Sequence, residues 1–174
     1  MESTSTQSPT TTAVGLRYGL LTGLVSVIIS FGINALHMEN SPAKWLTMPV
    51  LIGGIVLAQQ EFKKRDGGFM SYGQGLGIGT VLSATVGVIS AVFTYVYTTF
   101  IDPDMMTRAM EKAQADMEAK GLSAAQIDQA MAMSAKFTTG PVLAISVIIG
   151  TLIIGFIFSL VISAIIKNTK PEFE

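Results

Sequence analysis

Long uncharged apolar stretches alternate with short polar segments along this chain. The longest covers residues 71–101 without one charged side chain. Residues 142–166 are likewise uncharged, and residues 16–36 carry one charge, Arg17, near their start. About 20 apolar residues are enough for a helix to cross a hydrocarbon core roughly 30 Å thick. The pattern therefore predicts an all-α integral membrane protein.

A fourth apolar stretch, residues 45–60, is shorter and contains Pro49 and the pair Gly53-Gly54. As a helix it would extend about 24 Å, which is slightly less than the hydrocarbon core. It could cross the membrane or form a re-entrant segment. We expect it to cross, because only then do most basic residues near the spans fall on one side, and we predict four transmembrane helices.

Small residues occupy every fourth position of the stretch 71–101: Gly75, Gly79, Ser83, Gly87 and Ala91. Such spacing lets helix backbones approach closely in membranes. We predict a packing seam against another span of this chain or against a second copy. A phosphate-binding loop is disfavoured, because the glycines do not match GxGxxG and no Walker lysine follows.

The charged segment 102–139 is predicted to form an extracytoplasmic helical hairpin. Asp102 is expected as an N-cap, Gly121 as the end of the first helix, and Ser123 as the start of a capping box. Four methionines at helical spacing form a candidate partner-docking face: Met106, Met110, Met117 and Met131. Thioethers can bind Cu(I), but adaptable packing is the favoured interpretation.

Composition and charge narrow the classes further. The chain is 49% hydrophobic and 13% charged, has a net charge of -1 and contains no cysteine. Soluble domains carry about a quarter charged residues. Disulfides and thiol chemistry are excluded, and nucleic acid is not an expected partner. Residues 1–14, rich in Ser and Thr, are predicted to be a disordered tail, and residues 15–174 a single helical membrane domain.

The basic residues indicate an orientation. If four segments cross, the cluster Lys63, Lys64 and Arg65 shares a side with Arg17 and Lys167. The positive-inside rule then places both termini in the cytoplasm and the hairpin outside. The same cluster is a candidate contact for anionic lipid headgroups.

Asp, Glu, Lys, Arg and His are missing from the interiors of the predicted spans, where such residues mark ion paths and proton relays. We therefore expect no catalytic, cofactor-binding or metal-binding residue. The favoured function is a non-enzymatic structural or accessory protein, working through helix packing and the hairpin, with the bilayer and a second copy or another membrane protein as partners. The alternative is a small channel or transporter subunit.

Three segments resemble a known family: residues 69–79 (FMSYGQGLGIG), 95–103 (YVYTTFIDP) and 149–167 (IGTLIIGFIFSLVISAIIK). They are similar to the bacterial membrane-protein family named domain of unknown function 4199, common in Bacteroidota. The resemblance covers almost everything after the tail. It implies a four-span protein of the bacterial inner membrane, and it brings no catalytic residues.

Overall fold

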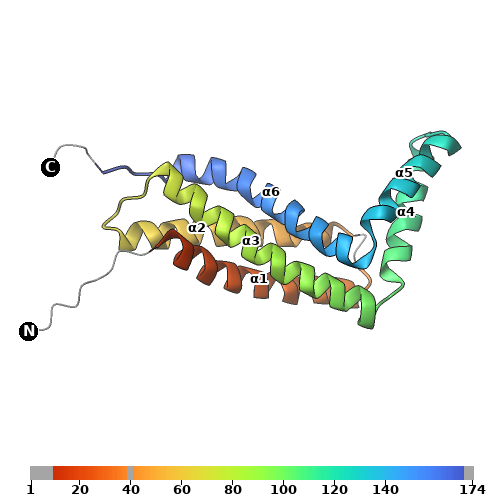
Figure 1. Ribbon diagram of the computed structural model, residues 1–174, viewed down its shortest axis with the longest axis horizontal. Coiled ribbons are helices and arrows are strands. Elements are labelled where there is room, and N and C mark those ends of the chain that lie inside the picture. The colour runs from red at the N-terminus through yellow and green to blue at the C-terminus, as the bar shows by residue number, and fades with distance from the viewer. Residues whose placement is uncertain (1–9, 39–40, 171–174) are drawn as a thin grey trace, which may run out of the picture.

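Four long helices form a bundle in the computed structural model, which describes residues 10–38 and 41–170. They are α1 (Thr11–Ala35), α2 (Thr47–Arg65), α3 (Tyr72–Val96) and α6 (Gly140–Ile166). Two shorter helices, α4 (Met105–Ala119) and α5 (Ala124–Phe137), lie side by side and project from one end of the bundle (Figure 1). A 3₁₀ helix, η1 (Pro42–Leu46), precedes α2, and a π-helical segment, η2 (Tyr97–Ile101), follows α3.

Helix α3 is the central member of the bundle. Its most extensive contacts are with α6 on one side and with α1 on the other. Helix α2 contacts all three of these helices. The start of α1 and the end of α6 lie at the same end of the bundle, opposite the α4–α5 pair (Figure 1). The stretch predicted to be the longest span is thus the element on which the others pack.

The outward surface of the bundle is apolar. Exposed side chains include Leu24 and Val92, each 61% exposed, and Ile165, 77% exposed. Helices α1, α6 and the continuous helical segment Tyr72–Ile101 are long and apolar enough to cross a membrane. Water does not favour so much exposed apolar surface on a single chain, and these helices indicate a membrane protein.

The predicted tail is wrong where it meets α1. The helix begins at Thr11, and the Thr10 side chain accepts a hydrogen bond from the Ala13 amide, 3.2 Å away. Val14 is only 6% exposed and belongs to the core. A segment rich in Ser and Thr can also be the start of a helix, because their hydroxyl groups accept hydrogen bonds from the free amides of the first turn. The prediction for residues 1–9 lies outside the described residues.

Helix α2 differs from the predicted stretch 45–60 at both ends. It starts at Thr47 after η1 and continues to Arg65. The turn follows at Gly67 and Gly68, whose φ angles of 68° and 90° suit glycine. The basic cluster therefore occupies the last helical turn, where cations interact favourably with the free carbonyls. The 19 residues of α2 extend about 28 Å.

The junctions around α3 and α4 also depart from the prediction in one respect. Helix α4 starts at Met105, and Asp102 forms an ion pair with Arg108 in place of an N-cap. At the start of α5, the capping box of Ser123 and Gln126 is present as predicted. Ser71 and Gln74 form a second capping box at the start of α3.

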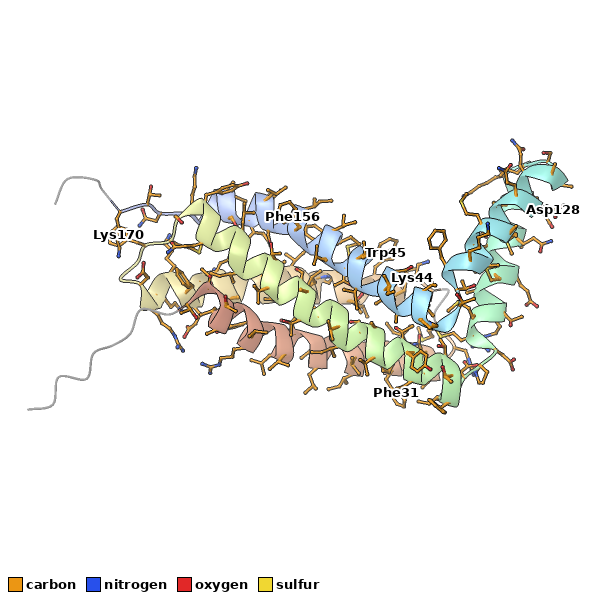
Figure 2. The ribbon with its side chains drawn as sticks, in the orientation of Figure 1. Phe31, Lys44, Trp45, Asp128, Phe156 and Lys170 are labelled. Atoms are coloured by element: carbon orange, nitrogen blue, oxygen red, sulfur yellow. The ribbon has the colours of Figure 1, made fainter. Side chains whose placement is uncertain are left out.

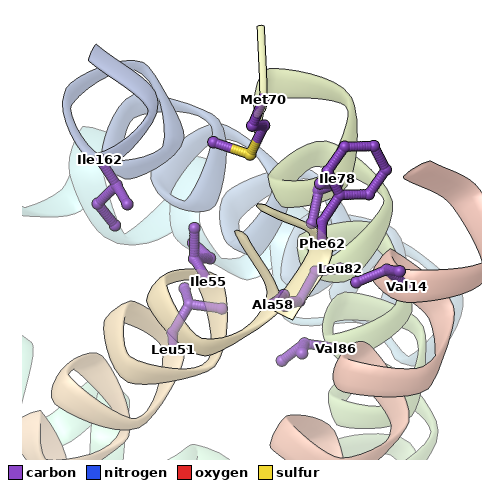
Figure 3. Close-up of a cluster of buried hydrophobic side chains, with 10 residues drawn as sticks. All are labelled: Val14, Leu51, Ile55, Ala58, Phe62, Met70, Ile78, Leu82, Val86 and Ile162. Carbon is purple, nitrogen blue, oxygen red and sulfur yellow. The ribbon is translucent and has the colours of Figure 1, made fainter. Parts of the chain in front are cut away.

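The buried apolar core lies mainly in the half of the bundle where α1 begins and α6 ends. Figure 3 shows this cluster, to which all four long helices contribute. Its members are Val14, Leu51, Ile55, Ala58, Phe62, Met70, Ile78, Leu82, Val86 and Ile162. The half of the bundle next to the α4–α5 pair is less completely filled, as the cavities described below indicate.

Candidate functional site

The predicted seam on α3 packs against α6 of the same chain. A Cβ atom added to Gly75 would lie 2.6 Å from the hydroxyl oxygen of Ser163. A Cβ atom on Gly79 would overlap the Ser159 side chain. These distances are shorter than van der Waals contact, so only glycine permits this approach of the two helices.

The pairing reverses one turn further along. Here Ser83 belongs to α3, and the glycine opposite it is Gly155 of α6, where an added Cβ would overlap the serine side chain. Gly87 then faces the α6 backbone, with its Cβ position 3.2 Å from the Cα of Ile148. Ala91, the last seam residue, is only 3% exposed. The seam residues of α3 are thus covered by packing within one chain.

A second glycine ladder joins α1 to the opposite side of α3. Added Cβ atoms on Gly15 and Gly19 would lie 2.8 Å and 2.7 Å from the Cβ atoms of Val81 and Thr85. Gly23 continues the ladder one turn later. The bundle is therefore held at close range on both sides of α3, by small residues at four-residue spacing.

Gln59 of α2 is completely buried where α2, α3 and α6 meet. Its amide nitrogen donates to the Gly75 carbonyl at 3.1 Å and to the Ser163 hydroxyl at 2.9 Å. Its amide oxygen has no partner among the described residues, and the hydroxyls of Ser83 and Ser159 have none either. A buried polar amide in an apolar bundle links three helices that share few other polar contacts.

The three basic residues of the cluster have different environments. The Lys63 ammonium is half-buried and donates to the Ile166 carbonyl at 2.9 Å, closing the end of α6. Arg65 pairs with Glu61 at 2.7 Å on the surface. Lys64 is exposed. The cluster therefore concentrates positive charge at the end of α2, and through Lys63 it also connects α2 to α6.

The segment after α6 is bound to the turn before α3. Met70 and Asn168 exchange two backbone hydrogen bonds of 2.8 Å, and the Asn168 side chain donates to the Gly68 carbonyl at 2.9 Å. Lys170 lies 3.5 Å from a carboxylate oxygen of Asp66. These contacts hold the end of α6 against the α2–α3 turn.

At the other end of the bundle, Arg108 makes a two-pronged ion pair with Asp102, at 2.6 Å and 3.2 Å. The guanidinium also lies 3.4 Å from His37 Nδ1. The hydrogen bond from Arg108 is the main cause that lowers the pKa of Asp102, and the positive charge of Arg108 adds to it. The ion pair fixes α4 to the end of η2.

The four methionines of the predicted docking face, Met106, Met110, Met117 and Met131, are half-buried. The adjacent Ile127 of α5 is only 6% exposed. The α4–α5 interface therefore covers part of the methionine face, and the most exposed large apolar side chains of the pair are Met133 and Phe137, at 59% and 55%. Among described residues, no three His, Asp or Glu side chains group as metal ligands would.

Two adjoining cavities of about 360 Å³ and 240 Å³ lie in the half of the bundle next to the α4–α5 pair. Both are lined by Ser30, Lys44, Thr47 and Ser90, which come from α1, η1, α2 and α3. Lys44 and the adjacent Trp45 lie near that end of the bundle, far from Lys170 (Figure 2). The cavities combine hydroxyl groups, one cation and an apolar floor.

The chain matches one family model over residues 17–168, which is most of its length. The family is described as Protein of unknown function (DUF4199). The chain belongs to this family. No curated protein and no solved structure matches it.

Sequence reasoning missed Gln59 and the cavities. Gln59 lies two residues before Glu61, close to the charged end of its stretch, where a polar side chain does not stand out. For the cavity, a signal existed: Ser26 and Ser30 on α1, like Ser90 and Thr94 on α3, repeat at four-residue spacing. Such pairs fall on one face of a helix, but the sequence does not show that the two faces meet.

Proposed function

We propose that this protein is a non-enzymatic scaffold of the bacterial inner membrane that presents the α4–α5 pair to a protein partner outside the cytoplasm. The observation that carries the proposal is the use of the glycine–serine seam within the monomer. Because that seam already binds α6, it is not available to a second protein, and the outer surfaces of the α4–α5 pair project from the bundle where a partner outside the bilayer could contact them.

In this proposal α2 is a fourth span. Its sequence is less apolar than that of the other three, but it lies alongside them and contributes Leu51, Ile55, Ala58 and Phe62 to the shared core. Its length of about 28 Å is close to the hydrocarbon thickness. Trp45 before it and the basic cluster at its end are the residue types that favour membrane interfaces.

The proposed orientation places Lys63, Lys64 and Arg65 in the cytoplasm, together with the end of α6. The positive-inside rule supports it. The α4–α5 pair then lies outside. Its exposed Met133 and Phe137 provide an apolar contact for a partner, and methionine side chains adapt to irregular surfaces.

Impermeant maleimide labelling of single-cysteine variants tests the orientation, because the chain has no cysteine of its own. Exposed Ala119 and Thr169 lie toward opposite ends of the molecule. In intact spheroplasts Ala119→Cys should react and Thr169→Cys should react only after lysis. The reverse pattern would invert the orientation, and labelling of both would contradict the proposed span number.

Site-directed photo-crosslinking tests the partner role. A photoreactive residue in place of Met133 should give one discrete adduct in native membranes, and the same residue in place of exposed Lys64 should not give that adduct. Loss of the adduct in a Phe137→Ala background, with unchanged protein level, would assign the contact to α5. No adduct from any exposed position of α4 or α5 would refute the partner role.

The alternative, a small channel or transporter subunit, rests on the hydroxyl-lined cavities. Against it stands the filled core in the other half of the bundle, which would have to open for passage. Liposomes containing the purified protein should therefore show no flux above empty liposomes. Reproducible flux that depends on the protein would favour the alternative.

A further inference from the structure

We infer that the cavities next to the α4–α5 pair bind the headgroup and upper acyl chain of an anionic membrane lipid. This inference rests on the membrane setting of the bundle, and it does not depend on the proposed partner role of the α4–α5 pair. Three independent features of the lining lead to it: free hydroxyls, a cation without a carboxylate and an apolar floor that continues into the outer surface.

Four hydroxyls of the cavity lining make no hydrogen bond to the described residues, whereas the Thr47 hydroxyl donates to the Lys44 carbonyl at 3.3 Å. Ser26, only 6% exposed, has no hydrogen bond to any described residue, and the same holds for Ser30, Ser90 and Thr151. Several hydroxyls elsewhere on the bundle are satisfied within their own helix: those of Thr80, Thr85, Thr98 and Ser146 each donate to the carbonyl one turn earlier, at 2.8 Å. The hydroxyls of Ser83 and Ser159 are also unpaired, but they are enclosed in the seam and do not line the cavities. The hydroxyls of Ser26, Ser30, Ser90 and Thr151 are therefore available to a ligand, and a ligand with acceptor oxygens suits them.

The cation of the cavities is Lys44. Its ammonium lies 5.8 Å from the centre of the Trp45 ring and has no carboxylate partner among the described residues. An ammonium at a membrane interface attracts the phosphate of an anionic lipid. Lys44 lines both cavities, so a phosphate held there would be within the same space as the free hydroxyls.

The apolar part of the lining selects a lipid over a small soluble anion. The floor is formed by Leu51 and Val86, which are 6% and 4% exposed and belong to the core. The wall includes Ile154 of α6 and Trp45, which are 38% and 58% exposed and form part of the outer apolar surface. The cavity is thus continuous with the surface that faces acyl chains, and its volume is in the range of ligand sites.

The single tryptophan of the chain, Trp45, is a reporter for this site. The test uses nanodiscs of phosphatidylcholine that contain a minority of phosphatidylglycerol, with either one or the other lipid brominated near the top of its acyl chains. Bromine quenches tryptophan fluorescence on contact. Brominated phosphatidylglycerol should quench Trp45 as if enriched about fivefold at the site, the preference that one lysine–headgroup contact supports.

Two pairs of variants identify the source of that preference. Lys44→Gln should reduce the enrichment to that of bulk lipid, whereas Lys64→Gln, at the opposite end of α2, should retain it. Ser90→Leu should abolish the enrichment by filling the cavity, whereas Val88→Leu on the outer surface of α3 should not. If Ser90→Leu elutes as aggregate, Thr151→Val, which removes a hydroxyl at nearly constant volume, replaces it and should weaken the enrichment.

Three results would overturn the inference. Equal quenching by both brominated lipids in the wild-type protein would show that no anionic lipid is selected. Retention of the preference in Lys44→Gln would place the site elsewhere. Loss of the preference on addition of inorganic phosphate at constant ionic strength would identify a site for a free anion rather than for a lipid.

Discussion

Gln59 and Ser163 share a 2.9 Å hydrogen bond, although they are 104 residues apart in the chain. The contact lies in the interior where α2 meets α3 and α6, and Gln59 also donates to the Gly75 carbonyl there. Gln59, on the least apolar helix of the bundle, is therefore hydrogen-bonded to both helices that form the glycine–serine seam. The polar atom that is left over, the Gln59 amide oxygen, has no partner among the described residues.

We expect Gln59→Ala to lower the free energy of unfolding by about 1–3 kcal/mol, because it leaves a void and removes the partner of Ser163. Gln59→Met should cost less than about 1.5 kcal/mol, since the methionine side chain is similar in volume and leaves no unpaired amide oxygen. Unfolding by sodium dodecyl sulfate in mixed micelles measures both. The exposed neighbour variant Gln60→Ala should remain near wild type, and an equal loss in Gln60→Ala would show that Gln59 has no special role.

The contact between Gly79 and Ser159 in the seam can be tested by exchanging the small residue from one helix to the other. Gly79→Ala should destabilise the bundle because its Cβ atom overlaps the Ser159 side chain. Ser159→Gly removes that side chain, so the double variant should recover stability, with a coupling energy of at least about 1 kcal/mol. Thermal unfolding in detergent of the four proteins completes the cycle.

Gly150→Ala provides the matched control for the exchange. No atom lies within 4 Å of a Cβ atom at this α6 position, so the substitution should be neutral or slightly stabilising. Additive effects of Gly79→Ala and Ser159→Gly would mean that the two helices do not meet at these residues.

The α3 side of this seam could be predicted from the sequence. Glycines and serines at four-residue spacing on residues 71–101 predicted close packing, because only small side chains allow it. The partner could not be predicted, since α1 and α6 carry small residues at the same spacing: Gly15, Gly19 and Gly23 on the first, Gly155, Ser159 and Ser163 on the second. Which ladder meets which face of α3 depends on the rotation of each helix, and that is a property of the assembled bundle.

Features set by neighbouring residues could be predicted from the sequence, whereas features set by contacts between distant helices could not. The capping box of Ser123 and Gln126 was predictable because its hydrogen bonds join neighbours in sequence. Asp102 followed by Pro103 suits an N-cap, but α4 is preceded by Asp104, two residues later, and the ion pair of Asp102 with Arg108 depends on where the next helix starts. The burial of Gln59 and the free hydroxyls around Lys44 require the positions of other helices, so a pattern within one segment could not reveal them.

Lys63 and Lys64 provide a prediction that separates structure from charge. Lys63→Ala removes the hydrogen bond to the Ile166 carbonyl at the end of α6 and should lower the melting temperature. Lys64→Ala removes the same charge from an exposed position and should not. Both variants should keep the wild-type orientation in maleimide labelling, because two of the three basic residues remain. Equal melting temperatures would show that the contact of Lys63 contributes no stability.

The ion pair of Asp102 with Arg108 predicts a pH dependence that is confined to the acid range. Arg108 lowers the pKa of Asp102 in the folded protein below its ordinary value of 3.8. A carboxylate with a lowered pKa stabilises the folded state above that ordinary value, and the contribution is lost as the pH falls through the folded-state pKa. At neutral pH the contribution should be complete.

Hydrogen–deuterium exchange across η2 and the first turns of α4 measures this contribution locally. At pH 7, Asp102→Asn should exchange faster than wild type there, because a neutral amide pairs less strongly with the guanidinium. As the pH falls below 3.8 the difference between the two proteins should shrink, after correction for the intrinsic rate, and it should vanish once the pH is below the lowered folded-state pKa, where Asp102 itself is neutral. Exchange in the middle of α3 should be unaffected at either pH. A difference that stays unchanged however far the pH is lowered while the bundle remains folded would mean that the carboxylate charge is not what holds α4 against the end of η2.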